Sequence, residues 1–140
     1  MKEYNIAING FFGRMGQSIY KESQNFSNCK ITVGCDLDEK IKSNPKTSLT
    51  LTSNIKNESN LFDSIIDFSL PQSTIELIAK CIEIKKPITI GTTGFNEQQL
   101  DQINHASQSI PILLAPNMSY GVNATFSAIE HLAKVLKNYK

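Results

Sequence analysis

Apolar residues gather along the chain in short blocks separated by longer polar stretches. Five of these blocks are typical of β-strands, at residues 4–9, 30–36, 64–69, 86–91 and 110–117. The block SIIDFS at 64–69 reads as a continuous apolar run, which indicates a strand buried on both faces.

Between these blocks, apolar residues recur at helical spacing. After Pro71, which suits the first position of a helix, four of them follow the i, i+3, i+4, i+7 pattern: Ile75, Ile78, Ala79 and Ile82. Asn96 and Gln99 have the spacing of a capping box and predict the start of the next helix. A last helix is predicted from one apolar face: Val122, Phe126, Ile129, Ala133 and Leu136.

Two further segments complete the pattern. A helix is expected from about residue 14 to about residue 26. Residues 37–60 are polar and rich in Ser, Asn and Lys, and we interpret them as a long surface connection with a possible short strand at 49–51. Because strands and helices alternate, the sequence predicts an α/β fold with a parallel sheet covered on both faces.

Three glycines stand where the first strand should give way to the first helix, in the stretch GFFGRMG at residues 10–16. In a Rossmann-like doubly wound sheet, Gly10 would allow a sharp turn, Gly13 the approach of a pyrophosphate, and Gly16 close helix packing. Arg14 lies in the first helical turn, where a cation is unfavourable unless an anion binds there. A purely structural turn is the alternative, because Phe12 replaces the second glycine of the usual motif.

An acidic residue about 20 positions beyond such a turn often binds the adenosine ribose. Asp36 and Asp38 both lie at the end of the second predicted strand, and either could accept hydrogen bonds from ribose hydroxyls. A solvated turn is the alternative interpretation of the same stretch.

Composition narrows the function classes. The chain has 140 residues, enough for one domain, and a formal net charge of +1 with scattered basic residues, which gives no reason to expect nucleic acid or a membrane as a partner. The three cysteines form no Cys-x-x-Cys pair, so we expect reduced thiols in a cytoplasmic protein, with no disulfide and no metal site. Cys35 and Cys81 are expected in the core.

The chain has two histidines that could serve as acid–base groups. His105 lies on a mostly polar predicted helix, and His131 lies beside the apolar face of the last helix. Neither has an evident partner in the sequence, so we expect surface or packing roles and assign no catalytic residue.

Four motifs together resemble one enzyme family. They are GFFGRMG at 10–16, IDFSLP at 66–71, IGTTGF at 90–95 and APNMSYGVN at 115–123. In these motifs the chain is similar to the 4-hydroxy-tetrahydrodipicolinate reductases, also called dihydrodipicolinate reductases, of lysine and diaminopimelate biosynthesis. The resemblance covers the chain nearly end to end, with only residues 39–63 unmatched.

The resemblance implies which residues contact the cofactor. Asp38 matches the family's ribose ligand better than Asp36 does, and Thr93 would also reach a substrate carboxylate. The full set of implied cofactor contacts is Gly10, Phe11, Phe12, Gly13, Arg14, Met15, Asp38, Phe68, Gly91, Thr92, Thr93, Ala115, Pro116, Asn117 and Met118.

The resemblance also implies an activity. A full-length member would transfer a hydride from NADH or NADPH to a small cyclic imine dicarboxylate, and would form a homotetramer. Many members carry an arginine after the ribose ligand, where this chain has Glu39. A carboxylate at that place repels a 2′-phosphate, so NADH is expected to be favoured over NADPH. Lys40 and Lys42 are close enough in the sequence to soften this repulsion.

One family feature is missing from the sequence. The motif His-His-x-x-Lys-x-Asp-Ala-Pro-Ser-Gly-Thr, which belongs to the substrate and tetramerisation domain, does not occur in the 140 residues. We therefore expect residues 1–130 to be the dinucleotide-binding domain and 131–140 to begin the connection to the missing domain, so that this truncated chain alone is inactive. A stand-alone nucleotide-binding or regulatory module is the alternative.

Overall fold

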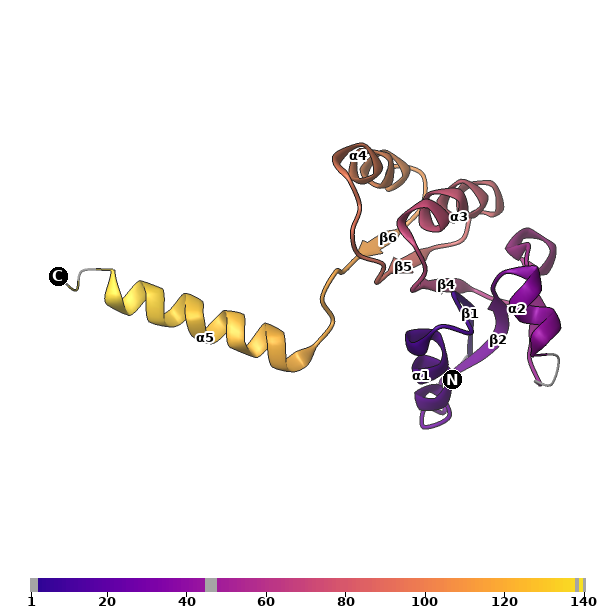
Figure 1. The fold of residues 1–140 in the computed structure, drawn as a ribbon, viewed down its shortest axis with the longest axis horizontal. Helices are drawn as coiled ribbons and strands as arrows, with labels where there is room; N and C mark the ends of the chain where they lie inside the picture. The colour runs from indigo at the N-terminus through magenta and orange to yellow at the C-terminus, as the bar shows by residue number, and fades with distance from the viewer. Residues whose placement is uncertain (1–2, 45–47, 138, 140) are drawn as a thin grey trace.

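A single parallel sheet organises the molecule. The computed structural model describes residues 3–44, 48–137 and 139. Its strands are β1 (Tyr4–Asn9), β2 (Cys29–Cys35), β3 (Thr50–Thr52), β4 (Ser64–Asp67), β5 (Ile88–Ile90) and β6 (Ile112–Leu114). They lie in the order β3-β2-β1-β4-β5-β6, and every pairing is parallel (Figure 1). The predicted Rossmann-like α/β fold is confirmed.

Four of the five described helices form where the sequence predicts them. The five are α1 (Arg14–Ser23), α2 (Asp38–Ser43), α3 (Pro71–Ile84), α4 (Glu97–Ala106) and α5 (Tyr120–Leu136). The face predicted after Pro71 is wrong by one residue, because Ala79 and Ile82 are exposed and the buried residues are Thr74, Leu77, Ile78 and Cys81. Pro71 occupies the first turn of α3, and both halves of the Asn96–Gln99 capping box are formed, as predicted. Helix α1 ends at Ser23, three residues before the expected end.

The expectation of one long connection over residues 37–60 is wrong in part. This segment contains helix α2, strand β3 and a 3-10 turn, η1 (Ile55–Glu58). Helix α2 has six residues and buries none of them, so it leaves no apolar periodicity in the sequence. The possible short strand exists, shifted by one residue to Thr50–Thr52.

The two faces of the sheet are covered unequally. Helices α3 and α4 pack over one face with the larger core, and α1 packs over the other around Ile8, Phe11 and Ile31. On the α1 face, Ile8, Ile66, Thr89 and Leu113 lie side by side across the sheet. Leu113 is 59% exposed, so among the described residues this face is covered only over its β1 and β2 side.

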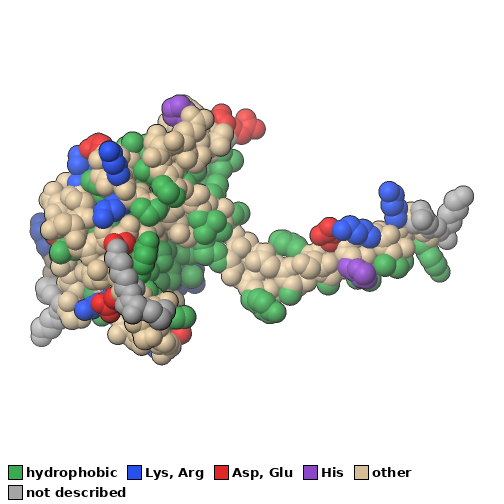
Figure 2. Space-filling model, turned by 180° about the vertical axis from the view of Figure 1, so that it is seen from behind, with side chains coloured by type: hydrophobic (Ala, Val, Ile, Leu, Met, Phe, Trp, Pro, Cys, Tyr) green, Lys and Arg blue, Asp and Glu red, His purple; other side chains and the backbone are tan. Residues whose placement is uncertain are grey.

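Helix α5 projects away from the rest of the molecule (Figure 1). Every described residue of α5 is exposed, and hydrophobic side chains lie on its surface among other groups (Figure 2). Its large exposed side chains include Val122, Phe126, Ile129, Leu132, Val135 and Leu136. The packed part of the molecule, which we call the body, consists of the described residues before α5, which begins at Tyr120. The predicted domain boundary at residue 130 stays a prediction.

Several predictions about single residues can be compared with this arrangement. Cys35 and Cys81 are buried, as expected, and burial raises the pKa of Cys35 to about 11 and that of Cys81 to about 12. His105 and His131 are both exposed. Among the described residues, no helix combines the length and the apolarity that crossing a bilayer requires.

Candidate functional site at the carboxyl edge of the sheet

The turn after β1 is built so tightly that two of its glycines have no room for a side chain. Gly10 has a φ of +76°, and a Cβ there would lie 2.4 Å from the carbonyl oxygen of Phe68. A Cβ on Gly16 would lie 2.5 Å from the carbonyl oxygen of Gly10. The first glycine therefore brings the turn against the β4–α3 loop, and the third brings α1 against the turn.

Helix α1 begins directly at this turn with its N-terminal amides uncapped by any side chain. Gly13 is the N-cap residue, and the first turn contains no acidic residue. Arg14 and Met15 are exposed at the same end. The helix N-terminus therefore presents N–H groups, a partial positive charge and a cation, which is an arrangement suited to an anion.

The two phenylalanines of the turn, Phe11 and Phe12, differ in how deeply they are buried. Phe11 is 2% exposed, and its ring packs against those of Phe12 and Tyr20 in the core below α1. Only the backbone of Phe11 can therefore reach a ligand. Phe12 is half-buried, and its N–H donates a hydrogen bond to Asp36.

A cleft of about 430 Å³ opens beside the glycine turn. Gly10 and Gly13 line one part of it, and Phe68, Ser69 and residues of α3, including Lys80, line another. Its position at the carboxyl ends of parallel strands is where open α/β sheets bind ligands.

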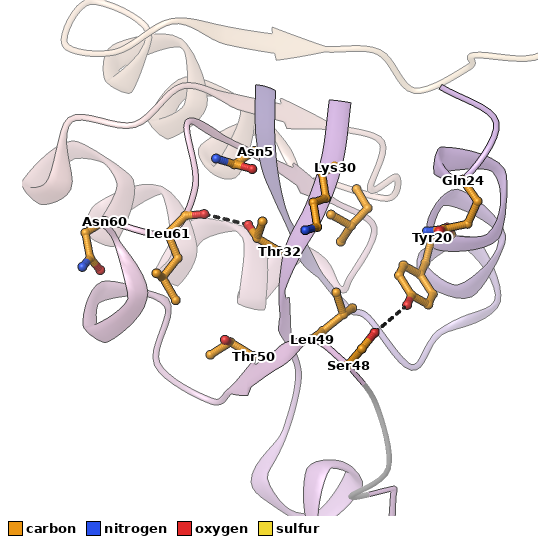
Figure 3. Close-up of a pocket in the computed structure, with 11 residues that line it drawn as sticks. Asn5, Tyr20, Gln24, Lys30, Thr32, Ser48, Leu49, Thr50, Asn60 and Leu61 are labelled. Carbon is orange, nitrogen blue, oxygen red and sulfur yellow. Dashed lines mark hydrogen bonds between the residues drawn. The ribbon is translucent and has the colours of Figure 1, made fainter. Parts of the chain in front are cut away.

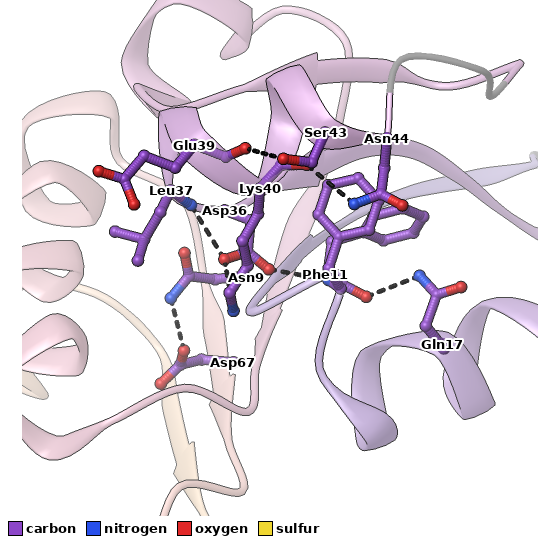
Figure 4. Close-up of polar contacts among 11 residues, drawn as sticks. Asn9, Phe11, Gln17, Asp36, Leu37, Glu39, Lys40, Ser43, Asn44 and Asp67 are labelled. Carbon is purple, nitrogen blue, oxygen red and sulfur yellow. Dashed lines mark hydrogen bonds and ion pairs between the residues drawn. The ribbon is translucent and has the colours of Figure 1, made fainter.

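Asp36 connects the end of β2 to this cleft (Figure 4). Its carboxylate accepts hydrogen bonds from the N–H of Phe12 at 2.8 Å and of Leu37 at 2.9 Å, and it pairs with the Lys40 ammonium at 3.1 Å. Asp36, Leu37 and Lys40 line the cleft, whereas Asp38 and Glu39 are exposed in the first turn of α2 and lie outside its lining. The ribose role of Asp38 stays a prediction.

The β5–α4 loop forms the next part of the edge. Gly91 packs on the ring of Phe68 so closely that a Cβ would lie 2.2 Å from it. Thr92 is 4% exposed and turns inward, where its hydroxyl accepts the N–H of Ser69 at 2.9 Å and donates to Asp67 at 3.0 Å. Thr93 is exposed, so of the two threonines it is the one whose side chain can reach a ligand.

The segment after β6 completes the edge. The N–H of Ala115 donates to the carbonyl of Ile90 at 3.0 Å, which keeps this segment alongside β5. Asn117 is half-buried, accepts the N–H of Ser119 at 3.0 Å and donates to Asn123 at 3.2 Å, so it orders the turn into α5. Pro116 and Met118 are exposed there.

The structure adds residues that the sequence analysis did not identify. Asn9 and Asp67 form a buried hydrogen bond at the ends of β1 and β4, and Lys80 lines the cleft. The available signal for Asp67 was a carboxylate inside the otherwise apolar run SIIDFS, because a charged group in such a run needs several partners.

A second hollow, of about 520 Å³, lies away from this edge (Figure 3). Its lining includes residues near the amino ends of β1 and β2, and some of its polar groups contact one another. The Thr32 hydroxyl donates to the carbonyl of Leu61 at 2.7 Å, and the hydroxyls of Tyr20 and Ser48 are 3.5 Å apart. Because parallel sheets bind ligands at their carboxyl ends, the cleft beside Gly10 is the candidate site.

These features define a class of protein. A glycine turn that leads into an uncapped helix N-terminus, beside a cleft at the carboxyl edge of a parallel sheet, makes a nucleotide-binding domain of the Rossmann type. Residues 4–118 match the family model described as dihydrodipicolinate reductase, N-terminus, and the chain belongs to this family.

Individual relatives agree with this assignment. The chain is 38% identical to the 4-hydroxy-tetrahydrodipicolinate reductase of Buchnera aphidicola subsp. Schizaphis graminum, over 95% of this chain and 52% of that protein. It is 39% identical to the reductase of the same name from Pelagibacter ubique, over 97% of this chain and 52% of that protein. The chain thus spans about half the length of these curated relatives.

A solved structure shares the fold. The dipicolinate-bound dihydrodipicolinate reductase from Paenisporosarcina sp. TG-14 superposes with a TM-score of 0.69 at 23% identity, over 82% of this chain and 48% of that chain. The resemblance of the motifs is confirmed at the level of the family.

Proposed function

We propose that this chain is the dinucleotide-binding part of a 4-hydroxy-tetrahydrodipicolinate reductase and that it binds NAD(P)H at the carboxyl edge of its sheet. The observation that carries the proposal is the meeting of three loops there. Gly10 lies against Phe68, Phe68 against Gly91, and Ser69 is hydrogen-bonded to Thr92. The pyrophosphate would lie over the turn at residues 10–15, and the nicotinamide near residues 91–93 and 115–118.

In the complete enzyme, the bound cofactor supplies a hydride to a cyclic imine dicarboxylate. This chain's residues would bind and orient the cofactor, and Thr93 would contact a substrate carboxylate. Proton donation and most substrate contacts would come from a second domain, and a homotetramer is proposed for the full-length protein. The test is a reductase assay of this chain with and without the C-terminal half of a relative added. Restored turnover supports the proposal, whereas dinucleotide binding without any restored turnover favours a binding or regulatory module.

Electrostatics at the end of β2 support a preference for NADH over NADPH. The positive charge of Lys40 is already matched by Asp36 at 3.1 Å. Asp38 and Glu39 then add two carboxylates in the first turn of α2, and Lys42 in its last turn offsets only one of them. A 2′-phosphate would meet this negative surplus, whereas ribose hydroxyls would not.

Calorimetric titration with both cofactors tests the preference. A lower Kd for NADH is expected, and Glu39→Gln should narrow the difference by raising the affinity for NADPH. Equal Kd values in the unmodified chain would contradict the preference without affecting the proposed site.

A further inference from the structure

Asp67 is a buried carboxylate at the centre of the loops just described. It is the last residue of β4 and is fully buried, with 0% exposure. Among the described residues it has no ion-pair partner. A buried carboxylate is unfavourable unless hydrogen bonds satisfy its oxygens.

Four side chains donate to this carboxylate. One oxygen accepts from the Asn9 amide at 2.7 Å and the Ser69 hydroxyl at 2.7 Å. The other accepts from the Thr74 hydroxyl at 2.5 Å and the Thr92 hydroxyl at 3.0 Å. The network is fully satisfied, which makes it rigid and directional.

Three of these donors belong to the segments that form the candidate site. Asn9 immediately precedes Gly10, Ser69 follows Phe68, and Thr92 follows Gly91. The fourth, Thr74, belongs to the body of α3. The Thr92 hydroxyl also accepts the Ser69 N–H, so it joins two of the loops while it is held by Asp67.

We propose that Asp67 is a positioning residue that holds the three cofactor loops in their binding arrangement before the cofactor arrives. This inference rests on the proposed function. Asp67 does not line the cleft and is completely buried, so any effect it has on cofactor affinity acts through the loops. Ordering the loops in advance removes the cost of ordering them on binding.

The chain offers matched variants for a test. Asp67→Asn keeps the shape but replaces two acceptor oxygens by one acceptor and one donor. Thr92→Val removes one loop hydroxyl, and Thr92→Ser keeps it. Cys81→Ala shortens a buried side chain of α3 that neither lines the cleft nor donates to Asp67, and serves as the control for loss of stability alone.

The readout is the Kd for NADH, measured where each variant is fully folded. Asp67→Asn and Thr92→Val should raise the Kd about tenfold, the equivalent of one lost hydrogen bond. Thr92→Ser and Cys81→Ala should stay within about threefold of the unmodified chain, whatever their Tm. If Asp67→Asn does not fold, the Thr92→Val and Thr92→Ser pair decides the question. Unchanged Kd values in folded Asp67→Asn and Thr92→Val would overturn the proposal.

Amide hydrogen exchange in the ligand-free protein separates this proposal from the proposed function. Faster exchange at residues 10–13 and 91–94 is expected in Thr92→Val and not in Cys81→Ala. If the unmodified chain binds no dinucleotide, the proposed function fails, but this exchange pattern still tests the positioning role. Equal exchange in the two variants would refute it.

Discussion

Helices α3 and α5 have similar apolar patterns and opposite surroundings. Helix α3 buries Thr74, Leu77, Ile78 and Cys81 against the sheet and α4, whereas α5 buries no residue at all. The comparison shows that apolar periodicity predicts that a helix forms. It predicts neither what covers the helix nor the exact face that is buried, because the buried face of α3 lies one residue earlier than the predicted one.

Chain connectivity explains the difference. Helix α3 joins the neighbouring parallel strands β4 and β5 through short loops, so it must cross the sheet and pack on it. Helix α5 follows β6, and within the described residues no strand follows it to return the chain to the sheet. All candidate cofactor contacts, from Gly10 to Met118, lie in the body, and none lies in α5.

The largest difference in stability between the two helices is expected when a leucine in each is replaced by alanine. Leu77 is 4% exposed in α3, and Leu132 is 57% exposed in α5. Leu77→Ala should lower the free energy of unfolding by about 3 kcal/mol, through lost burial and the cavity it leaves. Leu132→Ala should change it by less than ~0.5 kcal/mol. Urea unfolding measures both, and similar losses would show that α5 is packed in solution.

A glycine in the body and a glycine in α5 should also respond differently to replacement by alanine. Gly10→Ala should lower the free energy of unfolding by on the order of 2 kcal/mol or more, because of its positive φ and the contact with Phe68, and should abolish dinucleotide binding. Gly121→Ala meets nothing closer than 4.0 Å and should favour α5 by up to ~1 kcal/mol of helix propensity. Dinucleotide binding that survives Gly10→Ala would argue against the glycine turn as the binding site.

Raising the pH above 9 should lower the stability of the body, which contains two buried thiols, and α5 contains no cysteine. Burial raises the pKa of Cys35 to about 11 and of Cys81 to about 12, whereas an unfolded thiol titrates near 9.0. Above pH 9 the unfolded chain loses protons that the folded chain keeps, so stability falls as pH rises.

The expected loss by pH 10 is on the order of 1 kcal/mol for each thiol. Chemical unfolding at pH 7 to 10 measures it, and Cys81→Ala should flatten the decline while lowering stability at every pH. A stability that does not change between pH 8 and pH 10 would contradict the burial of these thiols.

The smallest difference in stability is expected when the N-cap residue of α4 or of α5 is removed. Asn96→Ala removes the capping box of α4 and should lower the free energy of unfolding by about 1 kcal/mol. Ser119→Ala removes the cap of α5 and should reduce helical circular dichroism without moving the urea midpoint of the body. A midpoint that moves equally in both variants would mean that α5 unfolds together with the body.

Local signals account for the parts of the fold that the sequence predicted. The strands, the first position of α3 and the Asn96–Gln99 capping box depend on neighbouring residues, and all were predictable. Helix α2 was not, because it buries nothing and so has no apolar periodicity. The glycine turn was predictable from its spacing. The hydrogen bonds to Asp67 were not, because they join residues up to 58 positions apart.

We expect the part of the chain that precedes α5 to bind a dinucleotide by itself at the carboxyl edge of the sheet. The decisive experiment is calorimetric titration of NADH into the full chain and into its Leu132→Ala and Gly10→Ala variants. One binding site is expected, with the same Kd for Leu132→Ala and no binding by Gly10→Ala. A well-folded chain that gives no heat and no rise in Tm at millimolar NADH would contradict it.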